Sequence, residues 1–167
     1  DGYGINEALI EEAYKDAIDT IITCDNGIAA AKPLEYAASL GMTCVVTDHH
    51  EIPYEMNGDE KQFCLPPAAA VVDPKREDCS YPFKKICGAV VAWKFVLKLW
   101  EGLQIDETKK RELLEFAGIA TVCDIMELLD ENRIIVKEAL KSMANSANAG
   151  LRALIRVHDL NPAKLSA

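Results

Sequence analysis

The sequence predicts an α/β fold in which a parallel sheet with flanking helices is followed by a mainly helical C-terminal half. Two apolar runs, at 20–24 and 42–47, are separated by a stretch with helical spacing. That order is typical of a β-α-β unit, whose right-handed crossover makes the two strands parallel. From about residue 76 onward, apolar residues recur at the three- and four-residue spacing of helices.

The first predicted helix runs from about Glu7 to Ala17, because Asn6 can cap it and apolar residues follow at helical spacing. A strand is expected at 20–24. Pro33 suits the first turn of a helix that continues through Leu40, where Gly41 provides a stop. The second strand is expected at about 42–47.

Residues 51–67 contain three prolines, one glycine and several charges, so we expect a loop there. A third short buried strand is expected at 68–72, ended by Asp73-Pro74. Four apolar helix faces follow. Their members are Val90, Trp93, Leu97 and Trp100; Leu113, Phe116, Ala117 and Ala120; Val136, Ala139, Leu140 and Met143; and Leu151, Leu154 and Ile155.

The 167-residue composition is that of one globular domain, and the net charge of −9 argues against a protein that binds nucleic acid unaided. Acidic clusters can instead hold divalent cations that face a phosphate. No apolar stretch is long enough to span a membrane, and no signal peptide is recognised, so we expect a cytoplasmic protein with six reduced cysteines. The chain lacks an initiating Met, and we expect it to be part of a longer protein.

Two predicted strands end in potential metal ligands. Asp25 follows the first strand, and Asp48, His49 and His50 follow the second. Because parallel strands bring their carboxyl ends to one edge of a sheet, these side chains should meet there. Carboxylate and imidazole together suit a divalent ion such as Mn²⁺. The alternatives are a turn residue for Asp25 and a solvated loop pair for the histidines.

Asp124 is a further candidate, because it lies in an otherwise apolar stretch and a buried carboxylate needs a partner or a metal. It could instead cap a helix. The backbone N–H groups of Gly88 and Ala89 open a predicted helix and could hold an anion, although close packing explains a glycine there equally well. A basic stretch is either solvated surface or a contact with a nucleic-acid backbone; it comprises Lys75, Arg76, Lys84 and Lys85.

Four segments in order resemble the RecJ branch of the DHH phosphoesterases: ITCDNGI, VVTDHHEIP, AAAVVDPKREDCSYPFKKICGAVVAWKF and ATVCDIMELLDENRIIVKEAL. The opening DGYG resembles the stretch before the second motif of that family. The resemblance covers nearly the whole chain and implies a 5′→3′ exonuclease on single-stranded DNA, active in DNA repair and recombination, that uses two Mn²⁺ or Mg²⁺ ions.

By this resemblance Asp25 bridges two metals, while His49 and Asp124 coordinate metal. Asp48 would orient the site from behind these ligands, and His50 would approach the substrate phosphate. Gly88 and Ala89 are weaker candidates for contact with that phosphate. Because His49 must be neutral to ligate, activity should fall below roughly pH 6.

The resemblance also implies two absent parts, namely an upstream Asp-x-Asp motif and a downstream substrate-binding domain. We therefore expect residues 1–167 to be a single partial DHH domain, with its sheet part at about 1–75 and its helical part at 76–167. Such a fragment should be inactive alone, and its uncovered sheet edge should favour self-association. Two alternatives remain open. One is another DHH phosphoesterase, acting on short oligonucleotides, cyclic dinucleotides or pyrophosphate. The other is a non-catalytic binding or scaffold relative.

Overall fold

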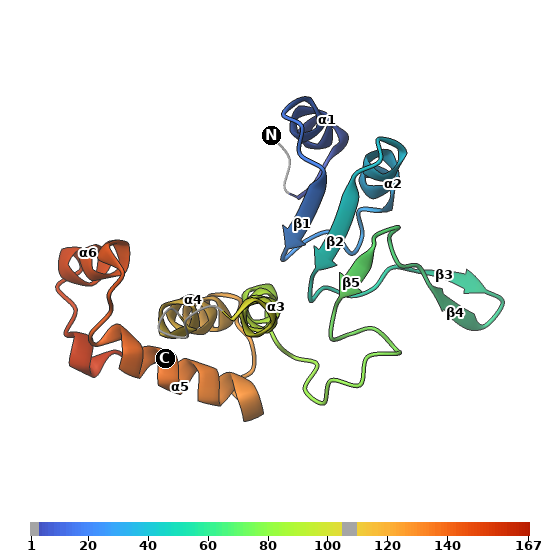
Figure 1. Ribbon diagram of the computed structural model, residues 1–167. Helices are drawn as coiled ribbons and strands as arrows, with labels where there is room; N and C mark the ends of the chain where they lie inside the picture. Colours follow the sequence, from blue (N-terminus) through green and yellow to red (C-terminus); the bar gives the residue numbers. More distant parts are fainter. Residues whose placement is uncertain (1–3, 105–109) are drawn as a thin grey trace. The chain divides into compact units, whose positions relative to one another are not determined.

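The computed structural model describes residues 4–104 and 110–167, with side chains from residue 112 in the second range. The chain forms two compact units, residues 1–84 and 85–167, and each is described by itself. The first contains the sheet and the second is helical, as Figure 1 shows. This distribution confirms the predicted fold class.

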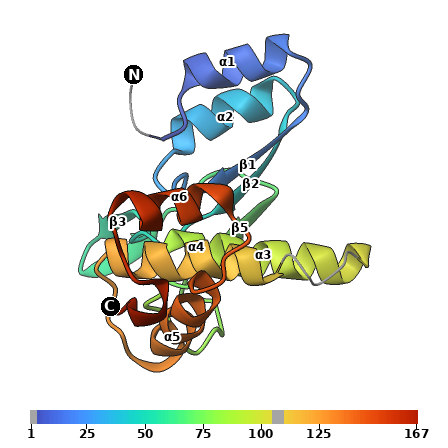
Figure 2. The ribbon, with the colours of Figure 1, turned by 90° about the vertical axis from the view of Figure 1, so that its left-hand side faces the viewer.

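The first unit is built on a three-stranded parallel sheet in the order β1-β2-β5. These strands are Thr20–Cys24, Thr43–Thr47 and Ala70–Val72. Helices α1 (Glu7–Lys15) and α2 (Ala31–Ser39) lie side by side on the same side of β1 and β2 (Figure 2). The core between helices and sheet is formed by Ile10, Leu34, Ala37, Met42, Cys44 and Val46.

Both helices follow the local signals in the sequence, and they end two residues and one residue earlier than predicted. Asn6 caps α1 by accepting a hydrogen bond from the backbone N–H of Leu9 at 3.1 Å. The helix ends before Ala17, whose φ of 58° is left-handed and incompatible with continuing it. Helix α2 begins at Ala31, which leaves Pro33 in the first turn, where its missing N–H removes no helical hydrogen bond.

The predicted loop at 51–67 is wrong, because it contains an antiparallel hairpin of β3 (Tyr54–Asn57) and β4 (Glu60–Phe63). The two-residue connection starts at Gly58, whose φ of 65° is favourable for glycine. Tyr54 and Phe63 face each other in the register, with ring centroids 5.9 Å apart in an edge-to-face arrangement. The prolines and charged residues of this segment favoured the prediction of a loop, so the short hairpin was missed.

The second unit contains four α-helices within the described residues and a short 3₁₀ turn, η2 (Pro162–Lys164). The helices are α3 (Gly88–Leu103), α4 (Lys110–Cys123), α5 (Asp130–Met143) and α6 (Ala149–Val157). Helix α4 contacts both α3 and α5. Gly118 of α4 allows the closest approach, since a Cβ at that position would lie 2.2 Å from the Cβ of Ala139.

The buried face of α4 differs from the apolar face predicted from spacing. Phe116 is 47% exposed, whereas Glu115 is 2% exposed and Thr121 is fully buried. Glu115 accepts hydrogen bonds from the hydroxyls of Ser142 at 2.7 Å and Ser146 at 2.5 Å. These bonds compensate the burial of a carboxylate, so a charged residue occupies a position that hydrophobic spacing could not reveal.

None of the six cysteines, all of which lie in the described residues, forms a disulfide. Cys44 is buried in the first unit and Cys87 in the second, whereas Cys24, Cys64 and Cys123 are exposed. Burial raises the pKa of the Cys44 thiol. No helix in the described ranges combines the length and apolarity that a membrane crossing requires.

Candidate metal centre

Three aspartates follow the three parallel strands at their carboxyl ends. Cys24 pairs with Thr47 and Thr47 with Val72, so Asp25, Asp48 and Asp73 each follow the last paired residue of a strand. The amide of Asp25 donates to Thr47 O at 3.0 Å, and the amide of Asp48 donates to Val72 O at 3.0 Å. The sheet register therefore brings three carboxyl groups to one edge of the first unit, where ligands bind in open α/β sheets.

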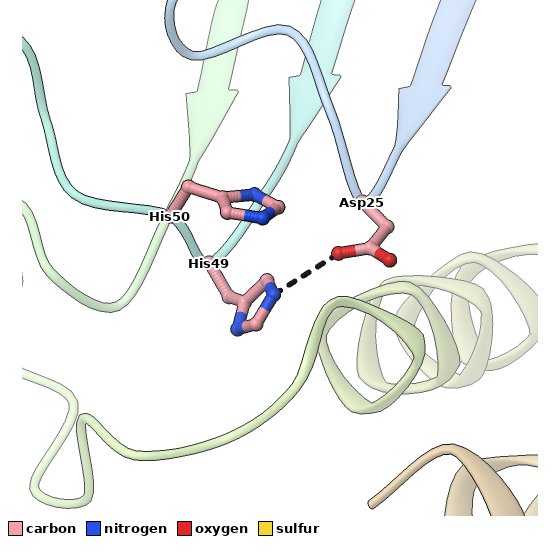
Figure 3. A group of neighbouring side chains, drawn as sticks. All are labelled: Asp25, His49 and His50. Carbon is pink, nitrogen blue, oxygen red and sulfur yellow. Dashed lines mark ion pairs between the residues drawn. The ribbon is translucent and has the colours of Figure 1, made fainter. Parts of the chain in front are cut away.

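The backbone of Asp25 leaves the strand conformation, with a φ of 61° in the left-handed region. Such a conformation is uncommon outside glycine, although aspartate tolerates it better than most residues. Figure 3 shows the Asp25 carboxylate and the His49 ring pointing toward one another. Their Oδ1 and Nε2 atoms lie 3.0 Å apart, although the two residues come from different strands.

Gly27 completes the turn that follows Asp25. Its φ is +111°, and a Cβ there would lie 2.8 Å from Thr23 Oγ1 and 3.2 Å from Val46 Cγ1. The turn therefore passes so close to the sheet that it has no room for a side chain. This tight passage fixes the start of the loop that leads from Asp25 to α2.

Asp25, His49 and His50 form a cluster whose candidate ligand atoms all lie within 4.8 Å of one another. It is the one group of three or more such side chains found in the part of the chain that the structure describes. The ring centroids of the two histidines are 4.5 Å apart. His49 is buried, whereas Asp25 and His50 have side chains 45% and 52% exposed, so the cluster opens to solvent on one side.

Asp48 supports this cluster from the interior. One carboxylate oxygen accepts from the amide of Ile28 at 2.9 Å, and the other accepts from the amide of His49 at 2.8 Å. The second oxygen also lies 2.6 Å from His50 Nδ1. Burial alone would raise the pKa of Asp48, but the hydrogen bonds from Ile28, His50 and His49 together hold it below its usual value. Asp48 is thus a buried anion that orients both histidines.

Asp73 lies next to this cluster, at the end of the third strand, and was not among the candidate site residues predicted from the sequence. It is 3% exposed, and its Oδ1 accepts from the amide of Lys75 at 2.8 Å. Burial, together with the nearby charge of Asp48, raises the pKa of Asp73. The signal available in the sequence was its position after the third strand, which matches those of Asp25 and Asp48.

Asp124 belongs to the second unit, so its predicted convergence with Asp25 and His49 stays a prediction. The expectation that it is buried is wrong, because its side chain is exposed. It does not cap a following helix either. It ends α4, where its amide donates to Ala120 O and Met126 N donates to Thr121 O. Gly88 and Ala89 are the first residues of α3, in the same unit.

The basic stretch is not a free cationic surface. Each of its four side chains has a protein partner: Lys75 pairs with Glu51, Arg76 with Asp78, and Lys85 with Glu127, while Lys84 donates to Cys79 O. These interactions favour the structural interpretation of the stretch over contact with a nucleic-acid backbone.

Curated relatives are similar in sequence to almost the whole of this chain. The single-stranded-DNA-specific exonuclease RecJ of Bacillus subtilis is 37% identical over 94% of this chain and 18% of that protein. The same enzyme of Escherichia coli is 33% identical over 100% of this chain and 29% of that protein. The chain therefore spans less than a third of the length of these relatives.

Solved structures agree in fold. A crystal structure of exonuclease RecJ bound to manganese superposes with a TM-score of 0.75 at 30% identity, covering 94% of this chain and 37% of that one. RecJ from Thermus thermophilus in complex with Mn²⁺ gives a TM-score of 0.73 at 29% identity, covering 95% and 22%. The family model described as the DHH family, N-terminal domain, matches residues 3–122, a range that contains Asp25, His49 and His50. The chain belongs to the DHH family.

Proposed function

We propose that this chain is part of a metal-dependent phosphodiesterase that degrades single-stranded DNA from its 5′ end. The observation that carries the proposal is the cluster of Asp25, His49 and His50 at the carboxyl edge of the sheet. The relatives that share this sequence are single-stranded-DNA-specific exonucleases. Their names favour this substrate over the other substrates of DHH phosphoesterases and over a scaffold role.

The donor set fits a divalent cation. One carboxylate and two imidazoles within 4.8 Å of one another suit Mn²⁺, which accepts both ligand types. Two of the similar structures were solved with manganese. We propose that Asp25 and His49 would hold Mn²⁺ or Mg²⁺ here, and the resemblance makes Asp124 a further candidate ligand.

When bound, such ions supply charge stabilisation at the phosphate and lower the pKa of water. The chain's own residues prepare the place where this chemistry occurs. The left-handed turn at Asp25 aims its carboxylate at His49, so the two ligands are oriented before an ion arrives. Preorganisation of this kind avoids the cost of rearranging groups on binding.

The Asp48–His50 pair has a separate role in this proposal. The buried Asp48 carboxylate lies 2.6 Å from His50 Nδ1 and so orients the His50 ring, which is half exposed. A ring held in this position beside the proposed metal ligands would contact a substrate phosphate. A pocket next to the cluster is lined by Ile5, Asn26, Ala29 and Pro33 as well as by Asp25 and His50, and it could accept the adjoining part of the substrate.

The metal centre can be tested on this chain directly, by titration with Mn²⁺ and detection of free Mn²⁺ by electron paramagnetic resonance. We expect saturable binding that Asp25→Asn and His49→Ala each weaken at least tenfold. Asp16→Asn, on the exposed end of α1, is the matched control. Binding that is unchanged in both site variants would exclude this cluster as the metal centre.

Activity is the second test, with single-stranded DNA labelled at its 5′ end and Mn²⁺ present. We expect the isolated chain not to degrade it, because the resemblance implies that an upstream acidic motif is needed for the second ion. A longer version that includes that motif should release short products, and Asp25→Asn should abolish the release. Robust turnover by the isolated chain, lost in Asp25→Asn, would contradict the need for upstream residues.

A further inference from the structure

Asp73 has an unsatisfied carboxylate oxygen beside the proposed metal centre. Its side chain is buried, and Oδ1 is held by the amide of Lys75. Oδ2 is also buried and has no hydrogen-bond partner within the described ranges. A buried acceptor without a donor is costly, so folded proteins rarely keep one without a further role. The oxygen therefore marks a position where a donor is expected.

The surroundings of Asp73 narrow the choice of donor. Asp73 interacts electrostatically with Asp48, Lys75 and His49. Asp48 is an acceptor that already receives several hydrogen bonds, and the Nζ of Lys75 lies 2.8 Å from a carboxylate oxygen of Glu51. Among these groups, the ring of His49 is the one that can supply an N–H and belongs to the proposed centre.

A metal ion bound to one nitrogen of the His49 ring determines which nitrogen carries the hydrogen. Its Nε2 faces Asp25, and its other ring nitrogen points away from Asp25 (Figure 3). A neutral imidazole has one lone pair and one N–H, so an ion at Nε2 leaves the hydrogen on Nδ1. Metal-ligating histidines usually donate that N–H to a carboxylate or a carbonyl, which fixes the ring.

We propose that Asp73 is a positioning residue that accepts the Nδ1–H of His49 when a divalent ion occupies Nε2. In this arrangement the ends of all three strands contribute to the centre: Asp25 from β1, His49 from β2 and Asp73 from β5. The inference rests on the proposed metal centre and adds a residue that supports it. Asp73 would act through His49 without touching the ion.

Asp73→Asn is the most direct variant, because the amide keeps the size and the acceptor for Lys75 but places an NH₂ group where Oδ2 was. We expect it to weaken Mn²⁺ binding by about 10–100-fold, the usual effect of removing such a partner. Glu115→Gln is the matched control, since Glu115 is an equally buried carboxylate in the other unit. It should leave Mn²⁺ affinity unchanged.

A nuclear magnetic resonance measurement gives a readout that a purely structural role would not move. In the wild-type chain loaded with diamagnetic Zn²⁺, ¹⁵N-labelled His49 should carry its hydrogen on Nδ1, with that proton strongly hydrogen-bonded. Asp73→Asn should lose the hydrogen-bonded signal while circular dichroism stays unchanged. If the variant does not fold, the wild-type spectrum still tests the proposal, because it shows which nitrogen of His49 carries the hydrogen and whether that hydrogen is bonded.

Three results would count against the proposal. Mn²⁺ affinity within twofold of wild type in Asp73→Asn would overturn it and leave the metal centre standing. Zn²⁺ bound through Nδ1, with the hydrogen on Nε2, would also overturn it. No Mn²⁺ binding by the wild-type chain would overturn the metal centre itself, and this inference with it.

Discussion

At the scale of single residues, two backbone features, at Asp25 and at Gly27, place the Asp25 carboxylate. Asp25 leaves β1 with a left-handed φ, and Gly27 then passes against Thr23 and Val46 without room for a Cβ. A side chain at Gly27 would push the loop away from the sheet. The orientation of a ligand and the packing of the turn are therefore coupled over three residues.

Gly27→Ala tests this coupling. We expect it to lower the free energy of unfolding by about 2–4 kcal/mol, because strain at a positive φ adds to a clash in the interior. Gly41→Ala is the control: its φ is +77°, but a Cβ there meets nothing within 4 Å, so about 1–2 kcal/mol is expected. Urea unfolding of both variants measures the difference, and equal losses would show that the close approach to the sheet is unimportant.

Asp48 should make the stability of the protein depend on acid pH. Its folded pKa lies below its unfolded value of about 4, so the folded state binds this proton more weakly. Its contribution is therefore fully present above about pH 4 and is lost as the pH falls through the folded pKa. Urea unfolding between pH 6 and pH 3 should show a smaller acid loss in Asp48→Asn than in the wild type.

The control for this pH series is Glu11→Gln, which removes an exposed carboxylate that pairs with Lys15. Exposed pairs contribute little, so its acid profile should match that of the wild type. Parallel profiles for Asp48→Asn and the wild type would mean that the hydrogen bonds to Asp48 do not survive in solution.

The candidate site was largely predictable from the sequence because its residues follow strands directly. Asp25, His49 and His50 needed only strand ends and a parallel register to be brought together. The burial of Asp73 was not predictable, since it depends on how the chain leaves β5. The exposure of Asp124 was missed because apolar neighbours in the sequence do not determine which face of a helix end is covered.

At the scale of elements, long periodic segments were predicted well and short polar ones poorly. The strands at 20–24 and 43–47 are apolar runs that pair in the sheet as predicted, although only the second is largely buried and the first has a single buried residue, Thr23. The hairpin at 54–63 was missed, since both of its strands are exposed throughout and carry no core pattern. Its signal was the turn glycine at 58, which follows alternating apolar and polar residues at 54–57.

The α4–α5 contact offers a sharp test of helix packing. Gly118→Ala should destabilise the protein by about 1–3 kcal/mol although alanine favours helices, because its Cβ would meet Ala139 at 2.2 Å. Adding Ala139→Gly should restore part of the loss, since it removes the opposing methyl group. Thermal and urea unfolding of the single and double variants provide the measurement.

Gly102→Ala in α3 is the matched control for that substitution. A Cβ at Gly102 meets nothing within 4 Å, so helix propensity alone should stabilise the protein by up to about 1 kcal/mol. The same chemical change is thus expected to have opposite signs in two helices. A gain in stability at Gly118 would mean that the two helices are farther apart in solution.

At the scale of the whole molecule, the edge of the three-stranded sheet has consequences for association. Strand β1 pairs only with β2 within the described residues, and the Ile22 side chain is 53% exposed. An open strand with apolar side chains tends to pair with another chain. Sedimentation velocity at micromolar concentrations should therefore show concentration-dependent dimers or larger species.

Ile22→Lys should shift that distribution toward the monomer, because a lysine on an edge strand resists pairing. Leu9→Lys, which changes an equally exposed residue on α1, is the control and should leave association unchanged. A wild-type protein that is monomeric over the whole concentration range would show that the β1 edge does not drive association.

The distribution of thiols allows the opening of each half of the molecule to be timed separately. Cys44 and Cys87 are 4% and 2% exposed, and they lie in different units. A reagent that reacts only with accessible thiols reaches each of them when its own surroundings open. Mass spectrometry of the tryptic peptides would then give a separate labelling rate for each of the two cysteines in one sample. A shared rate would indicate one cooperative unit, and two rates would indicate halves that open independently.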